Sequence, residues 1–173
     1  MKFFLIFSVI FFVFSGCEKD SPTELPHVSD EAPYLMSWDD AVKYCEILQE
    51  KGSDNWRLPT ISELRTLIRN CPYTEYPKPT SQEDWCEVTD ECTSDEDCKG
   101  LICGSSDLGV TVCKPDKGGK YSVFEESGAF WSSTENPDYP EWKDRTSWLI
   151  MFLNAGLYSE PQYREHRVRC WLD

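Results

Sequence analysis

Residues 56–68 read Trp56-Arg57-Leu58-Pro59-Thr60-Ile61-Ser62-Glu63-Leu64-Arg65-Thr66-Leu67-Ile68, and this stretch carries the clearest local signal in the chain. Thr60 and Glu63 form a Thr-x-x-Glu capping box, the pattern that opens a helix by satisfying its first backbone N–H groups. Apolar side chains then recur at helical spacing as far as Cys71, and Pro72 stops the helix. The stretch therefore predicts a helix that begins at Thr60 and buries one face.

A first helix is predicted immediately upstream. Ser37 is a suitable N-cap, and the segment ends near Gly52. Its apolar stripe, at helical spacing, consists of Trp38, Ala41, Val42, Cys45 and Leu48. Cys45 is thus expected on the buried face.

Downstream of residue 120 the pattern changes to short runs rich in β-branched and aromatic residues. Strands are predicted at 129–133, at 147–153, at 157–159 after an Asn-Ala-Gly turn, and at 167–171. Two helices followed by a small antiparallel sheet make an α+β fold, because an α/β nucleotide-binding fold would alternate helices and strands.

Composition bounds the function. The chain has 173 residues, which suit one main core, and its 40% hydrophobic content is typical of a folded protein. Its formal net charge is −14, so we expect no binding to nucleic acid and no electrostatic attraction to anionic lipid.

The N-terminus is typical of an exported protein. Residues 1–16 contain one lysine, an apolar run to Phe14 and two small residues, and this run is shorter than the roughly 20 residues of a membrane-spanning helix. They resemble the signal peptide and lipobox of bacterial lipoproteins, which implies that Cys17 is lipidated (for example with palmitate) and anchors the chain to a membrane. Glu18 after the cysteine favours the outer membrane of a bacterial cell envelope. Residues 17–35, with three prolines, are expected to form a flexible tether, and 36–173 the domain.

Eight cysteines remain after Cys17. An even number in an exported chain predicts four disulfides rather than a zinc site, since Cys-x2-Cys knuckles are missing from the sequence. The same spacing argues against thioredoxin-like redox chemistry.

Several motifs together resemble one known family. They are Met36-Ser37-Trp38-x2-Ala41-x2-Tyr44-Cys45, Trp56-Arg57-Leu58-Pro59-Thr60-x2-Glu63-Leu64, Phe130-Trp131-Ser132-Ser133-Thr134 and Val168-Arg169-Cys170. The chain resembles the Lcl C-terminal domain family, a domain of unknown function related to the C-type-lectin-like fold and, more distantly, to formylglycine-generating sulfatase-modifying factors. The resemblance implies a C-type-lectin-like domain in which a Cys45–Cys170 disulfide joins the first helix to the last strand.

Residues 72–120 depart from a plain lectin-like domain and form a disulfide-rich insertion. The stretch from Glu91 to Cys113 resembles small cysteine-rich repeats of exported bacterial proteins. The pairings expected there are Cys92–Cys103, Cys98–Cys113 and Cys71–Cys86. Its carboxylates between 83 and 97 are the ligand type that calcium prefers and could also receive a cationic partner, but a solvated acidic loop is the favoured interpretation, so no metal site is predicted.

The candidate ligand loop follows the Phe-Trp-Ser-Ser-Thr motif. Calcium-dependent lectins use Glu-Pro-Asn or Gln-Pro-Asp, and here Glu135, Asn136 and Asp138 supply similar residues in another order, with Trp142 nearby as a residue that could stack on a sugar. An ordinary turn is the alternative interpretation.

No catalytic motif is recognisable in the sequence. A hydrolase would need a base beside a nucleophile, and neither of the two histidines in the sequence, His27 and His166, lies near a plausible nucleophile. Arg57 and Glu63 are interpreted as a structural ion pair. We therefore expect a non-catalytic lipoprotein that binds a protein or glycan, with no cofactor. The alternatives are a structural envelope lipoprotein without a ligand and an oxidase of the formylglycine-generating type. The net charge favours a neutral or cationic partner, unless Arg164, Arg167 and Arg169 form a cluster that receives anions.

Overall fold

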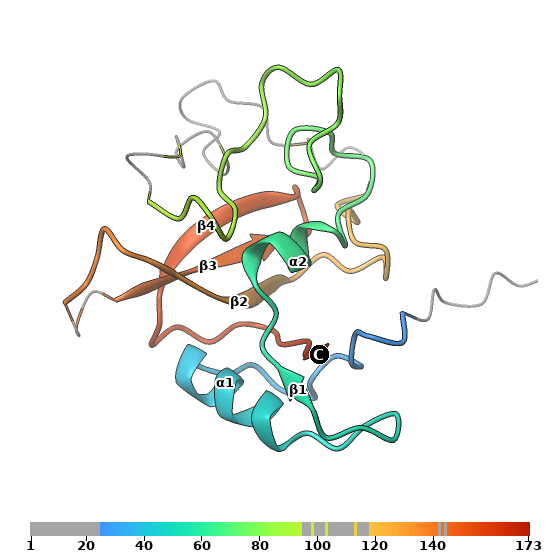
Figure 1. The fold of residues 1–173 in the computed structure, drawn as a ribbon, viewed down its shortest axis with the longest axis vertical. Helices are drawn as coiled ribbons and strands as arrows, with labels where there is room; N and C mark the ends of the chain where they lie inside the picture. Colours follow the sequence, from blue (N-terminus) through green and yellow to red (C-terminus); the bar gives the residue numbers. More distant parts are fainter. Residues whose placement is uncertain are drawn as a thin grey trace, which may run out of the picture.

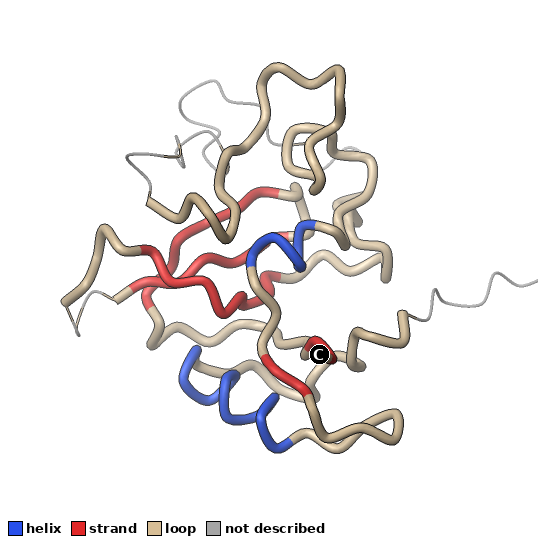
Figure 2. The backbone as a smooth tube through the Cα atoms, viewed as in Figure 1, coloured by secondary structure: helices blue, strands red, loops and turns tan. Residues whose placement is uncertain are grey.

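The computed structural model describes residues 25–94, 98, 103, 113, 118–141, 143 and 145–173. Its elements, in chain order, are α1 (Trp38–Ile47), β1 (Trp56–Arg57), α2 (Ile61–Arg65), β2 (Ala129–Asn136), β3 (Thr146–Met151), β4 (Gly156–Pro161) and β5 (Trp171–Leu172). Strands β2, β3 and β4 form an antiparallel sheet in that order, and β1 pairs with β5 in a separate antiparallel ladder. The α+β prediction is confirmed (Figures 1 and 2).

Helix α1 begins where the sequence predicts. The Ser37 side chain accepts a hydrogen bond from the Asp40 backbone N–H, and Ala41 and Cys45 face the interior with no exposed surface. The helix ends earlier than expected, because Leu48 is already extended and its N–H bonds to the Cys45 carbonyl. Residues 49–52 therefore form a loop instead of a last helical turn.

The central strand β3 separates two apolar clusters. Trp148 and Ile150 point into a cluster shared with α2 and the insertion, whereas Leu149 points into a cluster shared with α1. Figure 1 shows α1 on one side of the sheet and α2 with the insertion on the other. Burial on both faces explains the unbroken apolar run of this strand. Replacing Trp148, which is 1% exposed, with alanine is expected to destabilise the fold by about 3–5 kcal/mol.

Helix α2 has the predicted capping box but is shorter than predicted. It ends at Arg65, and the N–H groups of Leu67 and Ile68 bond to carbonyls three residues earlier, as in a tight turn. The Arg69 N–H then bonds to the Tyr121 carbonyl at 2.7 Å. The α-helix stops before Cys71 because this tertiary hydrogen bond takes the place of the next helical one.

The insertion is attached to α2 through a buried guanidinium. Arg65 has no exposed surface, and it donates to the carbonyls of Thr74 at 2.9 Å, of Cys86 at 3.1 Å and of Val88. Its Cζ atom also lies 4.3 Å from the centre of the Trp85 ring. Burial lowers the pKa of Arg65 from its ordinary value, since these dipoles and the ring replace water without a contacting carboxylate.

The N-terminal boundary predicted at residue 36 is wrong. Val28 is 1% exposed and pairs with Trp171, while Met36 exchanges two backbone hydrogen bonds of 2.9 Å with His166. Residues 28–36 thus run antiparallel to residues 166–171 and belong to the folded domain. The prolines that indicated a tether do not interfere, since a proline in an irregular edge segment sacrifices no regular strand pairing. Residues 17–24 of the predicted tether, and the predicted signal peptide, lie outside the described residues.

The last predicted strand is also corrected. Within residues 167–170, Arg167 forms a single bridge with Phe130 of β2, and the carbonyls of Val168 and Cys170 accept isolated hydrogen bonds from the 28–36 segment. Only Trp171–Leu172 form a regular strand, against β1. The stretch Trp56–Arg57, directly upstream of the capping box, supplies that partner strand.

The disulfide that joins α1 to the C-terminal end is present. Cys45 and Cys170 are bonded at 2.06 Å, 125 residues apart, and both have no exposed surface. This is the pairing that the family resemblance implies.

The three pairings expected inside the insertion are wrong. The structure joins Cys71 to Cys113, Cys86 to Cys103 and Cys92 to Cys98. The physical reason lies in tertiary contacts that spacing does not encode. The Cys103 carbonyl accepts a hydrogen bond of 2.7 Å from the Leu157 N–H in the edge strand β4. This contact places Cys103 at the edge of the sheet, where it bonds to Cys86 and not to Cys92.

Candidate functional site

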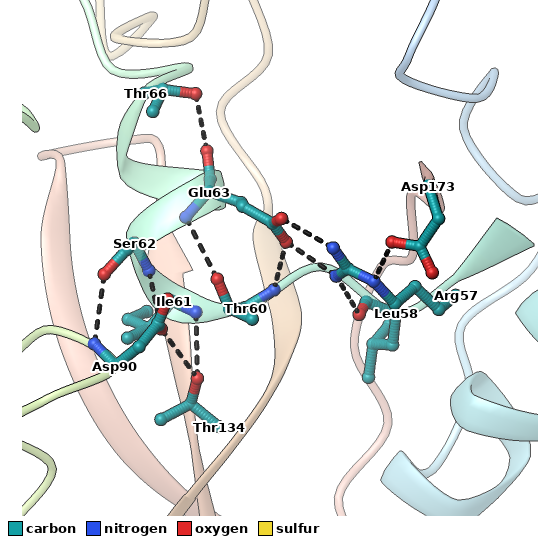
Figure 3. Close-up of polar contacts among 10 residues, drawn as sticks. All are labelled: Arg57, Leu58, Thr60, Ile61, Ser62, Glu63, Thr66, Asp90, Thr134 and Asp173. Atoms are coloured by element: carbon teal, nitrogen blue, oxygen red, sulfur yellow. Dashed lines mark hydrogen bonds and ion pairs between the residues drawn. The ribbon is translucent and has the colours of Figure 1, made fainter.

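The Trp-Arg-Leu-Pro-Thr-x2-Glu stretch forms a polar network at the start of α2 (Figure 3). Both Arg57 terminal nitrogens donate to the Glu63 carboxylate at 2.7 Å, and Arg57 Nε donates to Asp173 at 2.6 Å. Glu63 also accepts from the Thr60 N–H at 2.8 Å, which completes the capping box. Burial raises the pKa of Glu63, but the Arg57 and Thr60 hydrogen bonds outweigh it and leave the pKa lower than usual. The predicted structural ion pair between Arg57 and Glu63 is confirmed.

The same network connects α2 to the insertion and to β2. Ser62 and Asp90 exchange two hydrogen bonds, of 3.0 and 3.2 Å, and Thr134 accepts from the Ile61 N–H at 2.9 Å. Thr134 in turn donates to Asp90 at 3.3 Å. The side chains of Thr60 and Glu63 cap α2, and those of Arg57, Ser62, Asp90 and Thr134 join separate segments, so the network is scaffold that fixes where β2 leads into the following loop.

The predicted ligand-loop residues lie at the end of β2. Asn136 is only 2% exposed, and its side chain donates to Ser159 at 3.0 Å and accepts from the Asp138 N–H at 3.0 Å. Glu135 is exposed and forms an ion pair of 2.8 Å with Arg145 across the loop. Asn136 therefore shapes the loop from inside, whereas Glu135 and Asp138 lie on its surface. Trp142 lies outside the described residues.

The insertion supports this loop from the side. Ser94 donates to the Asp138 carboxylate at 2.8 Å, and the Trp148 indole donates to the Thr93 carbonyl at 2.8 Å. Thr93 and Ser94 both lie in the short loop that the Cys92–Cys98 disulfide closes.

A polar groove, here called the Tyr163 groove, opens beside the same loop. It has a volume of about 420 Å³ and is lined by Ser37, Asp39, Lys143, Arg145, Gln162 and Tyr163. Its walls come from the start of α1, the β2–β3 loop and the segment after β4. A second hollow, at residues 49–54, is bounded by a single loop.

Backbone contacts hold the three walls together. The Trp38 N–H bonds to the Gln162 carbonyl at 3.0 Å, and the Gln162 N–H bonds to the Arg145 carbonyl at 3.0 Å. The Gln162 amide also donates to Ser147 at 2.8 Å, and the Trp38 indole donates to the Ser132 carbonyl at 2.8 Å. The groove is therefore a preorganised part of the fold.

The chemistry of the groove is mixed in charge. The Arg145–Glu135 hydrogen bond and the attraction between their charges raise the pKa of Arg145, and Asp39 adds a smaller effect of the same sign. Tyr163 is 67% exposed and presents an aromatic face, with the Arg164 guanidinium 5.8 Å from its ring centre. Such a surface suits noncovalent contact with a small polar ligand.

Comparison with protein families identifies the chain. The model of the Lcl C-terminal domain matches residues 16–171. The chain belongs to the Lcl C-terminal domain family. A comparison with curated proteins finds no match.

The arginine cluster considered from the sequence does not form in this Lcl C-terminal domain. Arg167 forms an ion pair with Glu31, and Arg169, which is 9% exposed, forms one with Glu126. Both guanidinium charges are thus already compensated, while Arg164 lies beside Tyr163, with its guanidinium 5.8 Å from the ring centre.

The remaining candidates of this Lcl C-terminal domain have structural roles. Trp131 and Trp148 are at most 1% exposed, and the partly buried Trp171 packs against the cluster that contains Trp148. His166 packs edge-on against Trp131 with ring centres 4.6 Å apart, and burial lowers its pKa. Gln162 and Tyr163 were not identified as site residues from the sequence. The signal that the sequence offered for them was a tyrosine surrounded by polar residues.

The last features to consider are metal-binding clusters and membrane-spanning helices. Across the described ranges, three or more His, Cys, Asp or Glu side chains do not gather in a metal-binding arrangement. Residues 95–97 of the acidic run lie outside those ranges. Within the same part of the chain, each helix is too short or too polar to cross a bilayer.

Proposed function

We propose that this protein is a lipid-anchored bacterial envelope lipoprotein whose Lcl C-terminal domain is a non-catalytic binding module, C-type-lectin-like in fold, with the Tyr163 groove as its ligand site. The observation that carries the proposal is the groove itself, because a hollow of about 420 Å³ that presents an exposed aromatic ring beside several polar groups offers the contacts that a small polar ligand needs. It also borders the loop that the sequence singles out.

The position of the groove supports this function. The β2–β3 loop and the start of α1 lie at one end of the molecule, and the chain enters the domain from the opposite end (Figure 1). Lipidation of Cys17 would place that entry next to a membrane, since only residues 18–24 separate the anchor from the described domain. The groove would then face away from the bilayer, where envelope ligands have access.

The cysteines favour binding over catalysis. All eight cysteines that follow Cys17 are joined in four disulfides. An oxidase of the formylglycine-generating type would need reactive thiols, and thiol chemistry requires a thiolate. The disulfides therefore weigh against the oxidase alternative.

The anchor and the groove are tested separately. Growth with an alkyne-labelled fatty acid is expected to label the wild-type protein and not the Cys17→Ser variant. For the groove, the detergent-solubilised lipoprotein is applied to a glycan array and to immobilised envelope proteins. Tyr163→Ala is expected to lose binding, whereas Tyr34→Ala, which removes a ring that is 62% exposed outside the groove lining, is expected to retain it.

The two results have distinct meanings. Equal binding by Tyr163→Ala and the wild type would move the ligand site away from the groove. Binding to nothing on either surface would favour a structural lipoprotein without a ligand.

A further inference from the structure

The charges of the Tyr163 groove are balanced rather than of one sign. Lys143 and Arg145 contribute two positive charges, while Asp39 and Glu135, the ion-pair partner of Arg145, contribute two negative charges. Because Arg145 is compensated by Glu135, the charges left for a ligand are the Lys143 ammonium and the Asp39 carboxylate. Among the described residues neither of these two groups forms an ion pair within 4 Å.

These two charges come from different walls. Asp39 belongs to the first turn of α1, and Lys143 belongs to the β2–β3 loop. Both side chains are exposed, so each can contact a ligand. A ligand that spans the groove therefore meets a cation on one side and an anion on the other.

The surroundings disfavour a polyanionic ligand. The whole chain carries a formal charge of −14, and Arg167 and Arg169 are neutralised by Glu31 and Glu126. A polyanion would meet two cations that form no ion pair among the described residues, Lys143 and the neighbouring Arg164, but it would be repelled by Asp39 and by the net field of the protein.

The size and the aromatic wall indicate a compact ligand with ring faces. A volume of about 420 Å³ lies near the lower end of ordinary ligand pockets, which accommodate small molecules. The Tyr163 ring offers an apolar face beside polar neighbours, the combination on which a sugar ring packs with its C–H surface while its hydroxyl groups form hydrogen bonds. One or two sugar rings fit this description better than an extended polymer.

We propose that the Tyr163 groove binds a short saccharide that carries both an amine and a carboxylate, with the carboxylate at Lys143 and the protonated amine at Asp39. This inference rests on the proposed function, because it assigns a ligand class to the same groove. It differs from that function in requiring both charges on the ligand.

Four sugars with closely related rings separate these charges. Muramic acid carries an amine and a carboxylate, N-acetylmuramic acid only the carboxylate, glucosamine only the amine, and N-acetylglucosamine neither charge. Each is titrated by saturation-transfer NMR against the full-length lipoprotein in detergent micelles at pH 7. Because exposed ion pairs are weak, each charge is expected to improve the dissociation constant by up to about fivefold, so muramic acid ranks first and N-acetylglucosamine last.

Variants of the two charged residues assign each effect. Asp39→Asn is expected to remove the advantage of the amine and to keep that of the carboxylate, and Lys143→Gln the reverse. Asp84→Asn and Lys43→Gln are matched controls, since both residues are exposed outside the groove lining, and they are expected to keep the ranking of the four sugars. Circular dichroism of each variant verifies that it is folded.

The outcomes separate this inference from the proposed function. If the four sugars bind equally and Tyr163→Ala abolishes binding, the groove remains a ligand site and the two-charge inference is wrong. It is also wrong if the ranking survives both Asp39→Asn and Lys143→Gln, or if no sugar binds while another ligand requires Tyr163. If Tyr163→Ala binds every sugar as the wild type does, the proposed groove itself is wrong.

Discussion

The disulfides should contribute unequally to stability, in an order fixed by how far apart the paired cysteines lie in sequence. Cys45 and Cys170 are 125 residues apart, whereas Cys92 and Cys98 are 6 apart. In the chain-entropy model a cross-link stabilises the fold by restricting the unfolded chain, and the effect grows with the logarithm of the closed loop. The model gives about 5 kcal/mol for the first disulfide and about 2 kcal/mol for the second, a difference of about 3 kcal/mol.

Burial increases the contrast. Cys45 and Cys170 have no exposed surface and pack in the cluster between α1 and the sheet, so replacing both with alanine also removes apolar contacts. In the second pair Cys98 is buried but Cys92 is only partly buried, so replacing both is expected to lose less packing. The loss in Cys45→Ala/Cys170→Ala should therefore be at least the entropic value.

The assay is urea unfolding followed by tryptophan fluorescence, for the wild type and for each double-alanine variant. Domains of this size are typically stable by 5–15 kcal/mol, so the 45/170 variant can lie close to complete unfolding. In that case calorimetry ranks the stabilities of the two variants by their unfolding temperatures. A 45/170 variant that shows no cooperative unfolding transition agrees with the reasoning if the 92/98 variant retains one. Equal losses, or a larger loss in the 92/98 variant, would refute the loop-length argument.

The remaining predictions concern buried and paired ionisable groups. Arg65→Met is expected to destabilise the protein by about 3 kcal/mol or more in urea titrations, because buried carbonyls lose their donor, whereas the exposed Arg69→Met should change little. Burial lowers the pKa of His166 below its ordinary value of 6.5, so the unfolded chain takes up this proton at higher pH than the folded protein. The contribution to stability is therefore complete above about pH 6.5 and is lost as the pH falls through the folded pKa. Unfolding temperatures measured from pH 8 to pH 5 should show this decrease in the wild type and in His27→Gln, and a smaller one in His166→Gln. Glu63→Gln should lose about 1 kcal/mol at pH 7 and progressively less below pH 4.5, because the lowered pKa of Glu63 makes its contribution disappear on acidification; a loss independent of pH would contradict the ion-pair interpretation.

Local signals predicted the helices and their caps. Ser37 and the Thr60–Glu63 box act on backbone N–H groups within three residues, so their effect is contained in a few adjacent letters. The helical spacing of the apolar residues around Cys45 likewise predicts which face of α1 is buried. The end of α2 was not predictable in this way, because the Arg69 N–H bonds to Tyr121, a residue more than fifty positions away.

Cysteine pairing in the insertion depends on contacts of the same long-range kind. The pairings expected from the resemblance to small cysteine-rich repeats joined Cys103 to Cys92 and Cys113 to Cys98, whereas the structure places Cys103 at the edge of β4 and bonds Cys113 to Cys71. Arg65 shows the corresponding difficulty for side chains. Within its helix it looks like an ordinary exposed arginine, and its burial follows only from the carbonyls that the insertion brings to it.

The tether boundary was predicted wrongly, and the groove wall at the start of α1 was not predicted, for the same physical reason. Residues 28–36 and 166–171 pair through isolated bridges, and such pairing imposes no alternating pattern that a sequence could display. That pairing ends at Met36, whose carbonyl accepts from the Trp131 indole at 3.0 Å, so the next residue, Ser37, begins α1 directly beside β2. The Trp38 N–H then reaches the Gln162 carbonyl and closes the groove wall. A segment that looked like a spacer thus sets the position of Asp39 opposite the β2–β3 loop, and a deletion within residues 28–36 should disturb ligand binding even though none of those residues lines the groove.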